Sequence, residues 1–354
     1  MFFNFTAKLK KKLLTILNFL IFLTLGIILL YFAFRNISFQ TLLSDLKNAN
    51  YFWILLSLLL GFLGFVIRAY RWKMLIEPLG HKPPLKDAFH ALMTGYLANY
   101  TLPRFGEVTR CATLSRTNKI PIDALIGTVI IERTIDVIIL FSLVIIIFFT
   151  RINFFGQFLK TQVFDPLYEK IIAALNFSSI IWIAIISGII ILIIVFIRYR
   201  SGFSDLSFYR KTKKITLGIF EGLKTVFRMK RRKLFVFHSV LLWFIYFLMT
   251  WVVVYSIPET SHLTALDGLF LLVIGSLGMA APVQGGFGAF HWIIYKGLTI
   301  YGISREKGLV YATLSHESQT LLVVILGAYS FLLIFIERKK RKRLSFQAES
   351  KSAE

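Results

Sequence analysis

The chain has 354 residues, of which 56% are hydrophobic and 16% aromatic, and its mean hydropathy is +0.71. Soluble domains average about 45–50% apolar residues without repeated apolar runs of about 20, so the composition excludes a soluble protein and predicts an all-α, polytopic transmembrane helix bundle. The formal net charge of +23 does not indicate nucleic acid binding, because the basic residues lie between apolar segments and suit the positive-inside bias and anionic lipid headgroups.

The first apolar segment, residues 13–34, follows a group of lysines and is longer than a signal-peptide core, so we expect a retained helix. Further segments can each cross about 30 Å of hydrocarbon; they are residues 52–74, 122–149, 180–197, 235–255 and 309–336. Two more, residues 85–120 and 263–301, are apolar but interrupted by proline and glycine. Together these segments predict a single transmembrane domain over residues 1–336.

Charge predicts the orientation. The N-terminal lysines and the connections at residues 68–82, 198–233 and 338–343 are strongly basic, which places them and both termini on the cytoplasmic side of the membrane. Apolar residues recur every fourth position within residues 210–233, which predicts a basic interfacial helix; a regulatory or partner-binding helix is the alternative. Residues 337–354 are predicted to form a basic cytoplasmic tail.

Six complete membrane crossings place both termini in the cytoplasm if each interrupted segment enters the membrane and returns to the side from which it came. The first would enter from the cytoplasm and the second from outside, the arrangement of an inverted repeat. Two complete crossings by either segment remain the alternative.

The first interruption runs from Asn99 to Arg110 and contains Pro103 and Arg104. Broken helix at membrane depth persists only where protein or a polar cavity surrounds it, so a break in each half indicates a transport site. Arg104 and Arg110, with Glu107 between them, could hold a lipid phosphate, because guanidinium matches phosphate oxygens, and free N–H groups at a half-helix would add to the site. The alternative is an ordinary cytoplasmic turn.

The second interruption is uncharged and comprises Pro282, Gln284, Gly285, Gly286 and Gly288. Its glycines permit positive φ and close backbone approach, which could open backbone groups to a cavity. Tight packing of helices through small residues is the alternative. It is not a nucleotide-binding loop, since no Lys-Ser/Thr pair follows.

The predicted span 122–149 carries Glu132, Arg133 and Asp136, although each charge costs roughly +2.5 to +3.5 kcal/mol at a helix centre. Glu132 and Asp136 are four residues apart and share a face, and Arg133 can pair with Asp136. These three residues have two interpretations, a polar translocation path or a self-neutralising cluster that joins helices.

Later in the chain, His291, His316 and Glu317 lie near Gln319 and Thr320. They could relay protons, but a histidine hydrogen-bonded between helices is the commoner arrangement.

Asn99, Pro103, Arg104, Gly106, Glu107 and Arg110, then Glu132, Arg133 and Asp136, then Pro282, Gly285, Gly286 and Gly288, occur in an order that resembles the transmembrane region of lysylphosphatidylglycerol synthase/flippase proteins. The resemblance covers about residues 13–336. It implies a stand-alone, flippase-like bacterial or archaeal membrane protein in which these polar positions, with Gln284, line a headgroup path. We expect it in the bacterial cytoplasmic (inner) membrane. His316 and Glu317 stand where an arginine is expected, so no family role passes to them. We expect no aminoacyl-transferase domain and no lysine transfer.

The leading hypothesis is therefore movement of a phospholipid or lipid-linked substrate between leaflets. We expect no catalytic residue, cofactor or metal. The sequence has no Walker motif, and we expect no Asp-x-Asp pair, histidine–carboxylate metal cluster or nucleophile elbow, which argues against an enzyme. A membrane-embedded enzyme using Glu132 and Asp136 as acid and base, and a non-catalytic assembly partner, are the alternatives. Homo-oligomerisation is left open. Cys111, the single cysteine, excludes an internal disulfide framework, and we expect it to react from the cytoplasmic side.

Overall fold

A computed structural model describes residues 20–21, 23–31, 33–35, 38–101, 105–150, 160, 164–165, 168–169 and 229–351. The chain divides into two compact units, residues 1–145 with 230–354, and residues 146–229. All elements below belong to the first unit, apart from residues 146–150. The described residues form helices and no strand, which confirms the all-α prediction for that part of the chain. The predicted span 180–197 and interfacial helix 210–233 lie outside the described residues.

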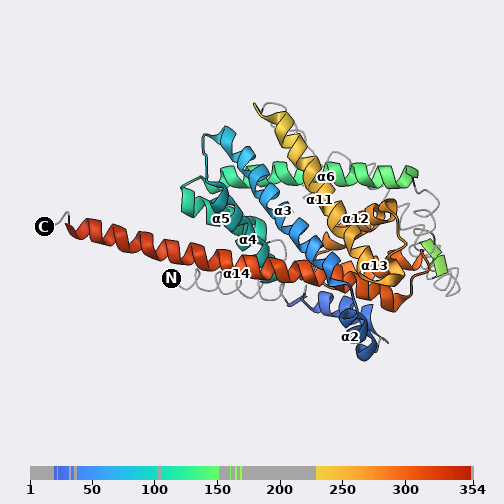
Figure 1. The fold of residues 1–354 in the computed structure, drawn as a ribbon. Coiled ribbons are helices and arrows are strands. Elements are labelled where there is room, and N and C mark those ends of the chain that lie inside the picture. The colour runs from blue at the N-terminus through green and yellow to red at the C-terminus, as the bar shows by residue number, and fades with distance from the viewer. Residues whose placement is uncertain are drawn as a thin grey trace, which may run out of the picture. The chain divides into compact units, whose positions relative to one another are not determined.

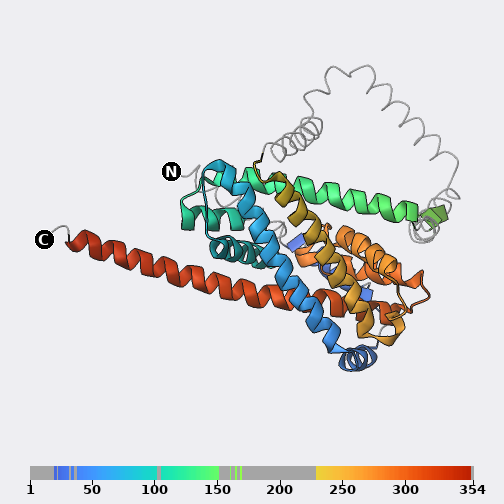
Figure 2. The same cartoon turned by 45° about the horizontal axis from the view of Figure 1, so that its top comes forward.

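Helices α3 (Tyr51–Ile76) and α11 (Arg232–Val252) pack side by side and run in opposite directions (Figures 1 and 2). Near the start of α3, the Ser57 hydroxyl donates to the carbonyl oxygen of Met249, 3.1 Å away. Near its end, the Arg71 guanidinium donates to the Ser239 hydroxyl, 3.4 Å away. α11 continues into the short helix η4 (Val253–Ser256).

The end of α3 corrects the sequence interpretation. Its charge predicts a basic loop at residues 68–82, but the helix continues to Ile76 and is followed by η1 (Glu77–Leu79). Arg68 and Arg71 are therefore helical and buried. The loop prediction is wrong for both, because a positive charge in the sequence does not reveal whether the folded chain supplies a buried carboxylate.

Three helices among the described residues are long and apolar enough to cross a membrane: Tyr51–Leu79, Arg232–Ser256 and Arg305–Lys339. The last belongs to α14 (Arg305–Lys351), a single helix of 47 residues. It therefore runs through most of the predicted tail at residues 337–354 without a break at residue 337. Helix α6 (Ile122–Thr150) occupies the segment predicted at residues 122–149.

Local sequence signals explain several helix starts. The Asn50 side chain accepts a hydrogen bond from the N–H of Phe52 and caps α3. Thr264 and Asp267 form a reciprocal capping box at the start of α12 (Ala265–Met279). Pro84 and Pro121 directly precede α4 and α6, where the missing N–H has no cost.

The two interrupted segments fold as pairs of short helices. The first pair is α4 (Leu85–Thr101) with α5 (Gly106–Asn118), and the second is α12 with α13 (Ala289–Thr299). The two helices of each pair pack against each other (Figure 1). Each half of the first unit therefore has the same order of a long helix, two short helices and a long helix: α3 to α6, then α11 to α14.

Helices α4 and α5 approach closely at two glycines. A Cβ on Gly106 would overlap the carbonyl oxygen of Gly95 and the Asn99 side chain. The Asn99 side-chain oxygen accepts a hydrogen bond from the N–H of Gly106 at 2.7 Å. Asn99 therefore satisfies one of the free N–H groups at the start of α5.

The two interruptions meet. Gly285 lies in η6 (Gln284–Gly286) with φ 56°, and a Cβ there would overlap the ring of Tyr100, at the end of α4. The ring centroids of Tyr100 and Phe287 are 6.1 Å apart. The Tyr100 hydroxyl also donates to Thr320 of α14 at 3.3 Å. One tyrosine thus joins both breaks to the last helix.

The core of the first half joins α3, α4, α5 and α6. It includes the fully buried side chains of Trp72, Leu92, Cys111 and Leu125. At the far end of α3, Lys307 of α14 binds the Asp45 carboxylate of α2 (Phe39–Lys47) at 3.0 Å and Glu259 at 2.8 Å. Glu259 lies in the short helix η5 (Pro258–Thr260). Lys307 therefore links three separate segments.

Candidate functional site

Glu132 lies at the centre of a group of charges formed by α3, α5 and α6. The side chain is fully buried. Its Oε1 lies 2.9 Å from Nε of Arg68 and 3.3 Å from Nη2 of Arg71, and its Oε2 lies 3.0 Å from Nη1 of Arg110. A buried carboxylate is costly without partners, and these three guanidinium groups supply both opposite charge and hydrogen-bond donors.

Asp136 lies one turn further along α6. Its Oδ1 is 2.7 Å from Nη1 of Arg71, and its Oδ2 is 3.5 Å from Nη2 of Arg68. Both carboxylates therefore point toward the same two arginines, as their four-residue spacing predicts. The expected pair between Arg133 and Asp136 is longer, at 3.7 Å.

Arg133 is the exposed arginine of the group, with 40% of its side chain accessible. Its Nε lies 3.1 Å from Oε1 of Glu107, whose Oε2 lies 2.7 Å from Nε of Arg110. We call the whole group the charged cluster: Arg68, Arg71, Glu107, Arg110, Glu132, Arg133 and Asp136. Four arginines face three carboxylates, so one positive charge is in excess, and Arg133 is the arginine that can present it to a ligand.

Aromatic side chains enclose the buried arginines. The Arg110 guanidinium lies over the Trp72 ring, 4.8 Å from its centroid, and that of Arg68 lies 5.6 Å from the centroid of Tyr96. Nη1 of Arg68 also donates to the Tyr246 hydroxyl at 3.2 Å. Such contacts favour a cation in a dry environment and fix the side chains in place.

A cavity of about 550 Å³ extends from the charged cluster to residues that flank the second interruption. Asn99 and Tyr246 lie on its wall, with Gln319 of α14. The charged cluster contributes Arg68, Glu107, Arg133 and Asp136. Met279 and Phe290, which flank the second interruption, and His316 of α14 also lie on the wall. The volume falls within the range of small-ligand sites, about 300–1,000 Å³. We call it the central cavity.

A larger hollow, of about 870 Å³, lies between α5 and α14 and is mainly apolar. Phe105, Val108 and Phe335 lie along it, and Arg116 and Arg338 are among the charged residues on its wall. We call it the apolar groove. The central cavity, and not this larger groove, carries the charged cluster, so the two hollows suit different parts of an amphipathic ligand.

The predicted site residues fall into three groups. The first group, Asn99, Glu107, Arg133 and Asp136, lines the central cavity. Glu132 and Arg110 form an ion pair next to it and do not line the cavity. Gly285 and Gly286 have positive φ in the second break, as expected of glycines there, and so does Gly288. Gln284 is buried and Pro282 is exposed. Pro103 and Arg104 lie outside the described residues.

The sequence analysis missed two members of the charged cluster, Arg68 and Arg71. A signal was present, because the two arginines are three residues apart in an apolar segment and so share a helix face, as do Glu132 and Asp136 in another. Complementary pairs of this kind predict a contact between two helices.

Cys111 is fully buried in the core between α3, α4 and α5. The expectation that its thiol reacts with a reagent on the cytoplasmic side is therefore wrong, since a water-soluble reagent does not reach a thiol that packing covers. A cysteine introduced at an exposed position is needed instead.

These features define a polytopic helical membrane protein in which buried arginine–carboxylate pairs line a cavity beside two interrupted helix pairs. The family model described as "Lysylphosphatidylglycerol synthase TM region" matches residues 16–327, and the chain belongs to this family.

One curated relative is "UPF0104 membrane protein MJ1595" of Methanocaldococcus jannaschii. It is 24% identical over 316 residues, which cover 86% of this chain and 92% of the relative. No solved structure gives a significant match.

Proposed function

We propose that the protein moves a phospholipid, or another lipid with an anionic headgroup, between the leaflets of the cell membrane. The observation that carries the proposal is the central cavity, whose wall combines charged side chains of the charged cluster with residues that flank the second helix break. A polar cavity of this kind would let a headgroup cross the bilayer while the acyl chains stay in hydrocarbon.

Arg133 is the proposed headgroup ligand. Glu132 and Asp136 hold Arg68 and Arg71 in ion pairs, whereas Arg133 is more exposed and lies on the wall of the central cavity. Its guanidinium could exchange its contact with Glu107 for a lipid phosphate, which it would bind through two parallel hydrogen bonds. The apolar groove beside α5 would hold an acyl chain, with Arg116 or Arg338 near a second phosphate.

The proposed topology has re-entrant pairs. At 1.5 Å per residue, the 13 residues of α5 extend about 20 Å and the 11 residues of α13 about 17 Å, whereas hydrocarbon is about 30 Å thick. These lengths support segments that enter the bilayer and return. The opposite directions of α3 and α11, with the repeated order of helix lengths, support an inverted repeat with both termini cytoplasmic.

The contacts of Glu132 and Asp136 favour transport over acid–base catalysis. Each carboxylate lies within 3.5 Å of both Arg68 and Arg71. A general acid or base must reach the substrate proton within hydrogen-bond distance, whereas the arginines already occupy both carboxylates.

The test is lipid exchange in liposomes that contain the purified protein and a panel of headgroup-labelled lipids. We expect exchange of anionic lipids that falls at least about tenfold in Arg133→Gln, since a charged hydrogen-bond pair contributes about 1.5–3 kcal/mol. Lys86→Gln is the matched control, because Lys86 is an exposed cation that pairs with Glu337 outside the central cavity. Absence of exchange for every lipid would contradict the proposal, and product formation from a lipid donor would favour an enzyme.

A further inference from the structure

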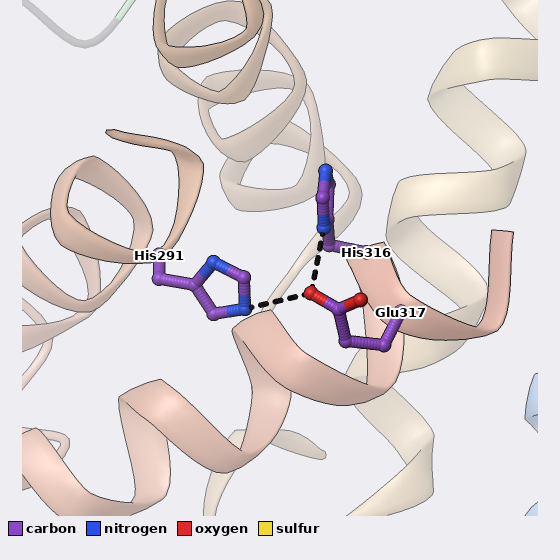
Figure 3. Close-up of side chains that lie close together, drawn as sticks. All are labelled: His291, His316 and Glu317. Atoms are coloured by element: carbon purple, nitrogen blue, oxygen red, sulfur yellow. Dashed lines mark hydrogen bonds and ion pairs between the residues drawn. The ribbon is translucent and has the colours of Figure 1, made fainter. Parts of the chain in front are cut away.

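Two imidazoles and a carboxylate meet beside the second interruption (Figure 3). Nδ1 of His316 lies 3.0 Å from Oε1 of Glu317, and Nε2 of His291 lies 3.3 Å from the same oxygen. One ligand atom from each residue lies within 4.8 Å of the other two. His291 belongs to α13, and His316 and Glu317 to α14, so two helices supply the group.

The hydrogen bond on the other side of His316 determines what Nδ1 can do. Nε2 of His316 lies 2.8 Å from the carbonyl oxygen of Gly285, which only accepts, so Nε2 is the N–H donor. A neutral imidazole then has a lone pair on Nδ1, directed at a carboxylate oxygen 3.0 Å away. Lone pairs that face each other at this distance repel unless a proton or a metal ion lies between them.

A metal ion fits the observed spacing. Two ligands at about 2.0–2.1 Å from one ion are about 2.9 Å apart at a right angle and about 3.4 Å apart at the tetrahedral angle. The distances of 3.0 and 3.3 Å from Oε1 of Glu317 to His316 and His291 lie within this range. The two imidazole nitrogens lie within 4.8 Å of each other, and a bound ion would draw them toward the tetrahedral spacing.

The surroundings hold the imidazoles in place. His291 and His316 are both buried. The ring of His316 stacks on Phe290, with centroids 5.0 Å apart, and meets Phe287 edge-on at 5.3 Å. Its N–H bond to a backbone carbonyl is the contact that commonly orients a metal-bound histidine. Gly285 therefore supplies this contact because the second break exposes its carbonyl oxygen.

We infer that His291, His316 and Glu317 form a binding site for a divalent transition metal of the zinc class. Nε2 of His291, Nδ1 of His316 and a carboxylate oxygen of Glu317 are the ligands, a set that imidazole and carboxylate chemistry matches to such ions. His316 also lines the central cavity, so a remaining coordination position would face it and take water or an oxygen anion. The expectation of no histidine–carboxylate cluster is wrong for these three residues, because the packing of α13 against α14, and not a local motif, brings them together. The inference does not depend on lipid movement.

The test uses the full chain in detergent, without a polyhistidine tag and after chelator treatment, titrated with Co²⁺. We expect one equivalent to bind and to produce visible absorption bands of low coordination number. His291→Ala, His316→Ala and Glu317→Gln should each raise the Kd at least about tenfold, since loss of even an outer contact costs about 10–100-fold. His90→Ala is the matched control, because His90 is a partly buried histidine that bonds Ser330 of α14 away from the group.

X-ray absorption of the wild-type zinc complex is the second measurement, and it needs no variant to fold. It should report two imidazole ligands and further oxygen ligands. The inference is overturned if the wild type binds no stoichiometric Co²⁺ or Zn²⁺, if the three variants bind like His90→Ala, or if no imidazole surrounds the metal. A proton on His316 would then occupy the space between the two lone pairs.

Discussion

The charged cluster predicts that Glu132→Gln lowers the unfolding free energy of the protein. Glutamine has the shape of glutamate, but one carboxylate oxygen becomes an NH₂ group. In one orientation that NH₂ faces Nη1 of Arg110, and in the other it faces Arg68 and Arg71. Donors then face donors in a buried site, and the excess positive charge of the cluster rises from one to two.

The magnitude follows from burial. Removing one partner of a buried ion pair costs about 3–5 kcal/mol, because the remaining charge has no compensation. Glu132 is fully buried and contacts three buried arginines, so we expect a loss of unfolding free energy in this range. The matched control is Glu337→Gln, whose carboxylate is 42% exposed and pairs with Lys86 at 3.3 Å. Exposed pairs contribute about 0–1 kcal/mol.

The assay is reversible unfolding of the two variants and the wild type in the same detergent or lipid. A double variant, Glu132→Gln with Arg71→Met, should recover part of the loss, because it returns the excess positive charge of the cluster from two to one and the two residues are coupled. If Glu132→Gln unfolds like Glu337→Gln, the cluster is hydrated, and the argument from burial fails.

Three further predictions concern single positions. Arg133→Gln should change the unfolding free energy by less than about 1 kcal/mol, because the Arg133 side chain is 40% exposed. The same variant should weaken binding of a phosphate-headgroup lipid. Equal loss of stability and of binding would assign Arg133 a purely structural role. Gly285→Ala should destabilise the protein more than Gly302→Ala in the same unfolding assay. Both glycines have positive φ, which costs alanine about 1–2 kcal/mol, but only a Cβ on Gly285 meets the Tyr100 ring. Equal losses would contradict the contact between the two breaks. Burial tends to raise the pKa of Glu259, but the hydrogen bond from Lys307 outweighs it and holds that pKa below its ordinary value. Its stabilisation is therefore present above the unfolded pKa and lost as the pH falls through the folded pKa, so the Tm difference between wild type and Glu259→Gln should shrink in acid; a constant difference would refute it.

Much of the helical framework could be predicted from the sequence. Long apolar runs identify α3, α11 and α14, and Pro121 marks the start of α6. The glycines at 285, 286 and 288 indicate a backbone break, and the spacing of Glu132 and Asp136 places both carboxylates on one face. Each of these features depends on residues close together in the chain.

The contacts between distant segments could not be predicted in the same way. Arg68 and Arg71 appear in the sequence as the start of a basic loop, and only the packing of α3 against α6 pairs them with Glu132 and Asp136. The same holds for Nε2 of His316, which donates to the carbonyl oxygen of Gly285, 31 residues away in the second break. The burial of Cys111 likewise depends on tertiary packing of four helices.

We propose, as the central claim, that both helix breaks lie inside the bilayer beside a hydrated cavity. Its most direct test is the depth of nitroxide labels in liposomes, measured by collision with oxygen and with a water-soluble nickel chelate, in a Cys111→Ser background. The labels are placed at Met279 and Phe105, exposed residues that flank the second and first breaks. We predict that both labels lie within the hydrocarbon region and that the one at Met279, on the wall of the central cavity, still meets the nickel chelate. Labels that behave as if in bulk water at both positions would contradict the account.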